Sequence, residues 1–259
     1  MSAQPGKTAR HLPELRVEGV SGAPPAPGES PAAGQPAVRL SPSMMCADLL
    51  AVGEELERFA AHKVEWLHQD IMDGHFVPNL TLGIDFCRAV AKVSAIRQDV
   101  HLMVERPEAY LDAFASLPGA RITFHPETTR HPVVAIERIR ALGASPGLAV
   151  SPATSLAGLV HLLPLVDQVT VMTVNPGFAG QKLIDWCLPK ISEVRAWAKI
   201  NRPDLDVEVD GNVSWTNIPR MVAAGANVLV LGTSSLFGAD MAREAAFARL
   251  EAMVGRPRG

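Results

Sequence analysis

The chain has 259 residues, 47% of them hydrophobic and 20% charged, with a formal net charge of -3 and a pI near 6.2. This length and composition allow one barrel domain or two smaller domains, and the slightly acidic balance excludes a basic surface for nucleic acid. Because the three cysteines are widely spaced, and neither a bilayer-length apolar run nor a secretory signal is present, we expect a cytoplasmic protein with reduced thiols.

The first 37 residues are predicted to be disordered, because Ser21 to Pro36 consists mostly of Gly, Pro, Ala and Ser. From Val38 onward, short β-branched runs alternate with helical patterns, so residues 38–259 are predicted to form one catalytic domain. Strands are predicted at 38–43, 65–71, 98–104, 121–125, 146–151, 167–173, 206–210 and 227–232. Helices are predicted at 48–61 after an aspartate cap, 83–93, 107–114, 131–142, 155–163, 188–200, 215–224 and 239–253. Eight strand–helix pairs predict an α/β fold, a (β/α)8 TIM barrel.

Three of the predicted strands end in residues that can bind a metal. His68 and Asp70 lie two residues apart in the second strand, so both side chains point to one face. His101 lies near the end of the third strand, and Asp210 ends the seventh. Such barrels place their chemistry at the carboxyl ends of the strands, so we expect the four side chains to converge on one mouth. Two histidines and two aspartates suit one divalent ion, and we expect Zn²⁺, with Mn²⁺, Fe²⁺ or Co²⁺ as alternatives.

Two loops rich in small residues are candidates for binding an anion at the same mouth. The sixth strand leads into Met172–Gln181 and the eighth into Gly232–Ser235. Small residues let backbone N–H groups approach a phosphate closely. The alternative is that Gly177 and Gly180 only supply turn conformations. Lys182 is the one cation that stands near this loop in the sequence, as a rim charge.

Six motifs in order along residues 38 to about 238 resemble the ribulose-phosphate 3-epimerase family: Ser41–Ser43, His68–Asn79, His101–Met103, His125–Glu127, Met172–Phe178 and Val209–Gly211. Within it, Ser43–Leu50, Asn79–Leu82, His125–Thr128, Phe178–Gln181 and Gly232–Phe237 are more similar to the D-allulose-6-phosphate 3-epimerase branch. The resemblance implies a barrel of the ribulose-phosphate-binding type.

The resemblance also implies a role for each matching residue. His68, Asp70, His101 and Asp210 would bind the metal. Asp70 would remove the proton at carbon 3, and Asp210 would return a proton on the opposite face. Substrate contacts would come from Ser43, Met72, His101, Met103, Met172, Gly177, Phe178, Ala179, Gly180, Gly211, Asn212, Gly232 and Thr233.

Two residues depart from the family pattern. Asn212 stands where these epimerases usually have a second glycine, and asparagine tolerates the left-handed backbone region better than most residues. Gln69 stands where an aliphatic residue is usual, and we expect its side chain to face the surrounding helices.

From the resemblance we expect a metal-dependent isomerase that converts D-allulose 6-phosphate to D-fructose 6-phosphate through an enediolate. The alternative is conversion of D-ribulose 5-phosphate to D-xylulose 5-phosphate, and a non-catalytic sugar-phosphate-binding barrel is a more remote one. A Schiff-base aldolase would need a lysine at a strand end, and the sequence places none there. We expect a small ketose phosphate as partner, neither nucleic acid nor membrane, and a homo-oligomer, either dimer or hexamer.

Overall fold

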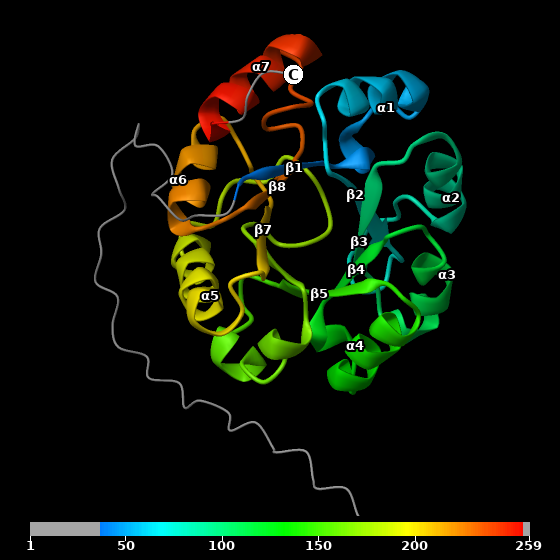
Figure 1. Cartoon of the computed structure of the whole chain (residues 1–259), viewed down its shortest axis with the longest axis vertical. Helices are drawn as coiled ribbons and strands as arrows, with labels where there is room; N and C mark the ends of the chain where they lie inside the picture. The colour runs from blue at the N-terminus through cyan, green and yellow to red at the C-terminus, as the bar shows by residue number, and fades with distance from the viewer. Residues whose placement is uncertain (1–36, 256–259) are drawn as a thin grey trace, which may run out of the picture.

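Eight short parallel strands form a barrel in the computed structural model, which describes residues 37–255 (Figure 1). The hydrogen-bonded order is β1-β8-β7-β6-β5-β4-β3-β2, and the parallel pairing of Ser43 with His68 links β1 to β2. Each predicted strand bound lies within one residue of the observed bound, so the (β/α)8 barrel is confirmed. The strands are β1 (Arg39–Pro42), β2 (Trp66–Met72), β3 (Arg97–Met103), β4 (Arg121–Phe124), β5 (Ser145–Val150), β6 (Gln168–Met172), β7 (Asp206–Asp210) and β8 (Val228–Leu231).

Helices surround the barrel, as Figure 1 shows. The α-helices of residues 37–255 are α1 (Val52–Ala61), α2 (Ile84–Val93), α3 (Leu111–Ala115), α4 (Pro132–Ala141), α5 (Cys187–Asn201), α6 (Asn217–Ala224) and α7 (Arg243–Val254). Short 3₁₀ segments add η1 (Met44–Cys46), η2 (Pro107–Ala109), η3 (Pro126–Thr128), η4 (Leu156–Leu159) and η5 (Leu163–Leu165).

Four helix predictions need correction, and one of them is the helix predicted at 239–253, which begins only at Arg243. The helix predicted at 155–163 is wrong, because η4 and η5 replace it, and Gly158 and Pro164 both disfavour a continuous α-helix there. The helix predicted at 48–61 begins only at Val52, since Asp48 Oδ1 accepts the Leu50 N–H within a turn instead of capping the helix. The helix predicted at 107–114 is divided into η2 and α3. The disorder predicted for the N-terminal segment concerns residues outside the described range, apart from residue 37.

The two faces of the strands differ in polarity. One set of alternating residues, including Leu67, Leu102 and Val209, is buried in the main hydrophobic core. The other set includes His68 and Glu208, both fully buried in a polar environment. Because side chains alternate along a strand, the polar set fills the barrel interior and the apolar set packs under the helices. The site described next is therefore built on a polar interior.

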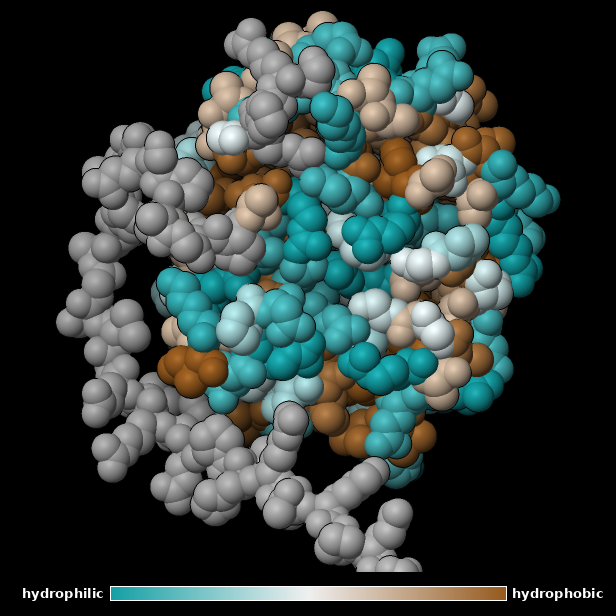
Figure 2. All heavy atoms as spheres, viewed as in Figure 1, coloured by the Kyte–Doolittle hydropathy of each residue, from teal (hydrophilic) through white to brown (hydrophobic). Residues whose placement is uncertain are grey.

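The surface agrees with this arrangement. Figure 2 shows mostly hydrophilic residues across the middle of the face in view and hydrophobic residues mainly toward its margins. Within residues 37–255, no helix has both the length and the apolar character needed to cross a membrane.

Candidate metal and substrate site

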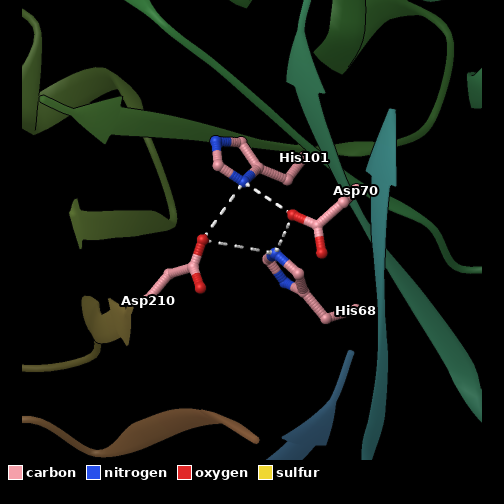
Figure 3. Close-up of side chains that lie close together, drawn as sticks. All are labelled: His68, Asp70, His101 and Asp210. Atoms are coloured by element: carbon pink, nitrogen blue, oxygen red, sulfur yellow. Dashed lines mark ion pairs between the residues drawn. The ribbon is translucent and has the colours of Figure 1, made fainter. Parts of the chain in front are cut away.

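Four side chains from three strands face one another at the barrel mouth (Figure 3). His68 and Asp70 belong to β2, His101 to β3 and Asp210 to the end of β7. Asp70 Oδ1 lies 3.3 Å from His68 Nε2 and 3.5 Å from His101 Nδ1. Asp210 Oδ2 lies 3.9 Å from His68 Nε2 and 3.6 Å from His101 Nδ1. The structure therefore brings the four predicted metal ligands together around one centre.

The donor atoms of this cluster fit a divalent cation. Within the described chain, His68 Nε2 and His101 Nδ1 are buried and make no hydrogen bond. Leaving a buried polar atom without a partner costs about 1–3 kcal/mol. Two such atoms that face the same point therefore indicate a site for a ligand. The four donor atoms lie within 4.8 Å of one another, close enough to share one ion. Mixed imidazole and carboxylate donors suit Zn²⁺ and the related first-row divalent ions.

The electrostatics of the cluster also attract positive charge. Burial alone would lower the pKa of His68, but Asp70 and Asp99 raise it well above its ordinary value. Burial opposes the shift of His101 as well, yet Asp210 and Asp70 raise its pKa. Burial would raise the pKa of Asp70, whereas His68 and His101 hold it well below its usual range. A proton or a metal ion can supply the charge that these groups require, and the two compete for the same nitrogens.

Asp99 fixes the orientation of His68. Asp99 Oδ2 lies 3.1 Å from His68 Nδ1, so this nitrogen donates its proton and leaves Nε2 free to bind the ion. Burial would raise the pKa of Asp99, but its hydrogen bond with His68 lowers it. Burial and the neighbouring Asp99 raise the pKa of Glu208, whose Oε2 accepts the Thr170 hydroxyl at 2.7 Å. Asp99 is therefore the acceptor for His68 Nδ1, while the shift of Glu208 favours its neutral form.

Ser43 holds the second oxygen of Asp70. Its hydroxyl donates to Asp70 Oδ2 at 2.7 Å, and both side chains are buried. Ser43 follows β1 and pairs with His68 at the point where the barrel closes. One oxygen of Asp70 therefore faces the two histidines while the other is oriented by a hydroxyl group.

A cleft of about 540 Å³, including the open space at its mouth, adjoins the cluster. Asp70 and Asp210 line the cleft, whereas His101 is absent from the lining and fully buried. The other predicted substrate contacts all lie in the lining: Ser43, Met72, Met103, Met172, Gly177, Phe178, Ala179, Gly180, Gly211, Asn212, Gly232 and Thr233.

Backbone conformation explains the small residues at one end of the cleft. Gly211 has φ +109°, and a Cβ there would lie 2.4 Å from Val174 Cγ2. Asn212 has φ 45°, which lies in the left-handed region. Asparagine tolerates this region better than most residues, which explains why it can stand where the family usually has glycine. The Asn212 amide donates to Gln181 O at 2.7 Å, and its Oδ1 accepts from Asn217 at 2.7 Å. The bond to Gln181 joins the loops that follow β6 and β7, and the bond from Asn217 ties Asn212 to the start of α6.

No lysine or arginine lines the cleft within residues 37–255, and Lys182 is exposed. An anion in this cleft would be bound by backbone N–H groups and by the hydroxyls of Thr233 and Ser234. Gln69 lies away from the site. Its amide donates to Gln98, which in turn donates to a carbonyl of α2, so it faces the helices as expected.

Sequence reasoning assigned no role to several polar residues of this region. Asp99 and Glu208 lie two positions before His101 and Asp210, so strand periodicity places them on the same interior face. His125 belongs to the motif His125–Glu127, and its ring nitrogen Nε2 lies 2.9 Å from His101 Nε2. The periodicity of the strands could have identified Asp99 and Glu208, whereas the contact of His125 depends on the closed barrel.

Comparison with known proteins supplies an independent finding. A model of the ribulose-phosphate 3 epimerase family matches residues 39–237 of this chain. The ribulose-phosphate 3-epimerase of Bacillus subtilis is 40% identical over 202 residues, which cover 78% of this chain and 93% of that protein. Ribulose-phosphate 3-epimerase 1 of Cupriavidus necator is 42% identical over 211 residues, covering 79% of this chain and 86% of that protein.

Solved structures agree on the fold. A structure of the tryptophan synthase complex from Pyrococcus furiosus has a TM-score of 0.59 with this chain, at 14% sequence identity. The match covers 86% of this chain and 98% of that chain. At this low identity the likeness concerns the barrel alone.

Proposed function

This chain belongs to the ribulose-phosphate 3-epimerase family and is an isomerase that epimerises a sugar phosphate at carbon 3, and we propose that it interconverts D-ribulose 5-phosphate and D-xylulose 5-phosphate. One observation carries the proposal. Two carboxylates, Asp70 and Asp210, line one cleft and share a centre with two histidines.

Epimerisation beside a ketone needs a base on one face of carbon 3 and an acid on the other. Asp70 is the base, because its carboxylate lines the cleft and Ser43 orients its second oxygen. It removes the proton from carbon 3, and the electron pair passes into a planar enediolate. Asp210 then returns a proton to the opposite face, which inverts the centre, and the reverse reaction exchanges the two roles.

The other residues position the substrate. Met72, Met103 and Met172 present soft apolar surface to the planar intermediate, while the glycine-bearing loops bind the phosphate. Phosphate binding at a distance from the reacting carbon supplies the energy that fixes this carbon between the carboxylates. A divalent ion held by the four ligands supplies Lewis-acid stabilisation of the negative charge that develops on the substrate oxygens. We propose Zn²⁺ as the ion.

The two candidate substrates are a pentose phosphate and a hexose phosphate, which differ in length by one carbon. The curated relatives carry the name of the pentose phosphate enzyme, which supports D-ribulose 5-phosphate. D-allulose 6-phosphate is a second candidate, because Ala179, Asn212 and the run Thr233–Ser235 resemble the hexose phosphate branch, and residues 179, 212, 233 and 234 line the cleft.

Other barrel chemistries fit less well. A Schiff-base mechanism would need an amine in the cleft, and no lysine lines it within the described residues. A binding protein without catalysis would have no need for two carboxylates and two unpartnered imidazole nitrogens at one point.

Head-to-head kinetics with one metal-loaded preparation test the proposal. We expect a higher kcat/KM for D-ribulose 5-phosphate, with measurable turnover of D-allulose 6-phosphate, because one extra carbon unit is worth about 1–3 kcal/mol of discrimination. The opposite ranking would replace the pentose by the hexose substrate. Failure to turn over either sugar phosphate with metal bound would contradict both candidates.

A further inference from the structure

We infer that His125, Ser151 and Glu127 form a hydrogen-bond relay that fixes the tautomer of His101 and thereby positions it as a metal ligand. The inference rests on the proposed metal site. It concerns three residues that have no role in the proposed mechanism. Ser151 follows β5, Glu127 lies in η3, and His125 directly follows β4. We refer to these three residues as the relay.

The relay is continuous over three contacts. His101 Nε2 lies 2.9 Å from His125 Nε2, and His125 Nδ1 lies 3.0 Å from Ser151 Oγ. The Ser151 hydroxyl donates to Glu127 Oε1 at 2.6 Å. The chain of contacts therefore leads from a fully buried metal ligand to a carboxylate whose side chain is 32% exposed.

The direction of each hydrogen bond follows from the carboxylate at the outer end. An ionised carboxylate only accepts, so Ser151 must donate to Glu127 and accept from His125 Nδ1. With its proton on Nδ1, His125 has a lone pair on Nε2, and His101 Nε2 must donate to it. His101 Nδ1 is then left with a lone pair. This is the nitrogen that faces Asp70 and Asp210 and makes no hydrogen bond.

The ionised state of Glu127 is supported by its surroundings. Burial would raise the pKa of this carboxyl, but His125, whose Nδ1 lies 3.5 Å from Glu127 Oε1, and the hydrogen bond from Ser151 lower it to about 2. Glu127 therefore remains an acceptor throughout the physiological range. A lone pair facing two carboxylates is stable only with a cation between them, so the relay prepares His101 for a metal ion.

Neighbouring contacts hold the relay in place. Lys190 of α5 donates to the carbonyls of Ser151 and Pro152 at 3.0 Å each and to that of Thr154 at 2.8 Å. On the other side, the Thr128 hydroxyl donates to the His125 carbonyl at 2.7 Å. These bonds fix the loops after β4 and β5, which carry the three relay residues. The geometry is therefore specified by several independent interactions.

Two substitutions and a matched control test the relay in the full-length protein. Ser151→Ala removes the hydroxyl link and Ser151→Thr retains it. Glu127→Gln removes the charge at the outer end with little change in size. Glu105→Gln is the control, because Glu105 also follows a barrel strand and is exposed, but lies outside the relay.

The readouts are apparent Zn²⁺ affinity from chelator competition, the absorption spectrum of the Co²⁺-loaded protein, and the melting temperature of the metal-free protein. We expect Ser151→Ala and Glu127→Gln to bind Zn²⁺ about 10–100-fold more weakly and to change the Co²⁺ spectrum. Ser151→Thr should restore affinity, and Glu105→Gln should bind as the wild type does. The metal-free melting temperature should fall somewhat in Ser151→Ala, which loses a partly buried hydrogen bond, and should match the wild type in Glu105→Gln.

Two outcomes would overturn the relay. Wild-type affinity in both Ser151→Ala and Glu127→Gln would show that His101 needs no such support. Equal loss in Ser151→Ala and Ser151→Thr would assign the effect to packing and not to the hydroxyl group. If instead the wild-type protein binds no metal, or binds it equally well after Asp210→Asn, the proposed metal site fails and the relay with it. The two kinds of failure are therefore distinguishable.

Discussion

Asp70 and Asp210 have the same chemistry but different surroundings. The side chain of Asp70 is 7% exposed and accepts a hydroxyl hydrogen bond, whereas the side chain of Asp210 is 16% exposed at the end of its strand. This difference suits an acid–base pair in which one group is ionised while the other carries the proton. The pair shares two imidazole neighbours, His68 and His101.

Asp70→Asn and Asp210→Asn should each lower kcat by about 10²–10⁴-fold, because each removes one of the two groups that exchange a proton with carbon 3. The measurement is steady-state turnover at known metal content. Asp85→Asn on the exposed start of α2 is the matched control and should leave kcat unchanged. Near wild-type turnover in either variant with metal bound would rule out the two-carboxylate mechanism.

Gly211→Ala should lower the free energy of unfolding by about 1–3 kcal/mol, because the new methyl group would meet Val174 at 2.4 Å in a backbone region that disfavours side chains. Gly143→Ala is the control, since Gly143 has φ +86° but no atom within 4 Å of a built Cβ. Gly143→Ala introduces backbone strain without a steric clash, so it should lower the free energy of unfolding by less than Gly211→Ala does. Urea unfolding measures both, and equal losses would show that the contact with Val174 is unimportant.

At the scale of elements, the sequence predicts strands more accurately than helices. The β-branched runs end at charged or turn residues, so every strand bound is correct within one residue. The helix predicted at 155–163 is wrong. Its apolar spacing indicates a helix, but Gly158 and the adjacent Pro164 disfavour one. The contacts of His125 and Ser151 were beyond prediction, because they join separate strands only when the barrel closes.

His62 links the first and last helices. Its ring lies 2.9 Å from both Glu244 and Glu251 of α7 and stacks on Phe247 at 4.1 Å between ring centroids. Burial alone would lower the pKa of His62, but Glu244 and Glu251 raise it. Because the folded pKa is raised, this stabilisation is complete below the unfolded value and is lost as pH rises through the folded value.

His62→Gln should therefore reduce the free energy of unfolding by about 0.5–1 kcal/mol more at pH 6 than at pH 9. Arg58 also contacts Glu244, and this contact is common to both proteins. The measurement is urea unfolding at the two pH values, with His161→Gln, an exposed histidine, as control. A loss independent of pH would assign the contribution of His62 to stacking on Phe247 instead.

At the scale of the molecule, the barrel and the convergence of the four predicted metal ligands follow from element order, because parallel strands in a closed sheet bring their carboxyl ends together. The identity of the metal, the homo-oligomeric state and the cytoplasmic location remain predictions. They depend on interactions outside the fold of a single chain.

Deletion of residues 1–36 should leave kcat and melting temperature nearly unchanged. The physical reason is compositional, because a segment rich in Gly, Pro, Ala and Ser can bury little apolar surface. Activity and thermal unfolding of the truncated protein provide the measurement. A fall of several degrees in melting temperature would show that this segment contributes to the stability of the barrel.

The central claim is that two carboxylates exchange the proton of carbon 3 through a planar intermediate. The most direct measurement is turnover of D-ribulose 5-phosphate, or of D-allulose 6-phosphate if that sugar is preferred, by the metal-loaded protein in deuterated water. Because each carboxyl group exchanges its proton with solvent, we predict that the product carries deuterium at carbon 3 and at no other carbon. Complete conversion with the original hydrogen retained at carbon 3 would contradict the claim.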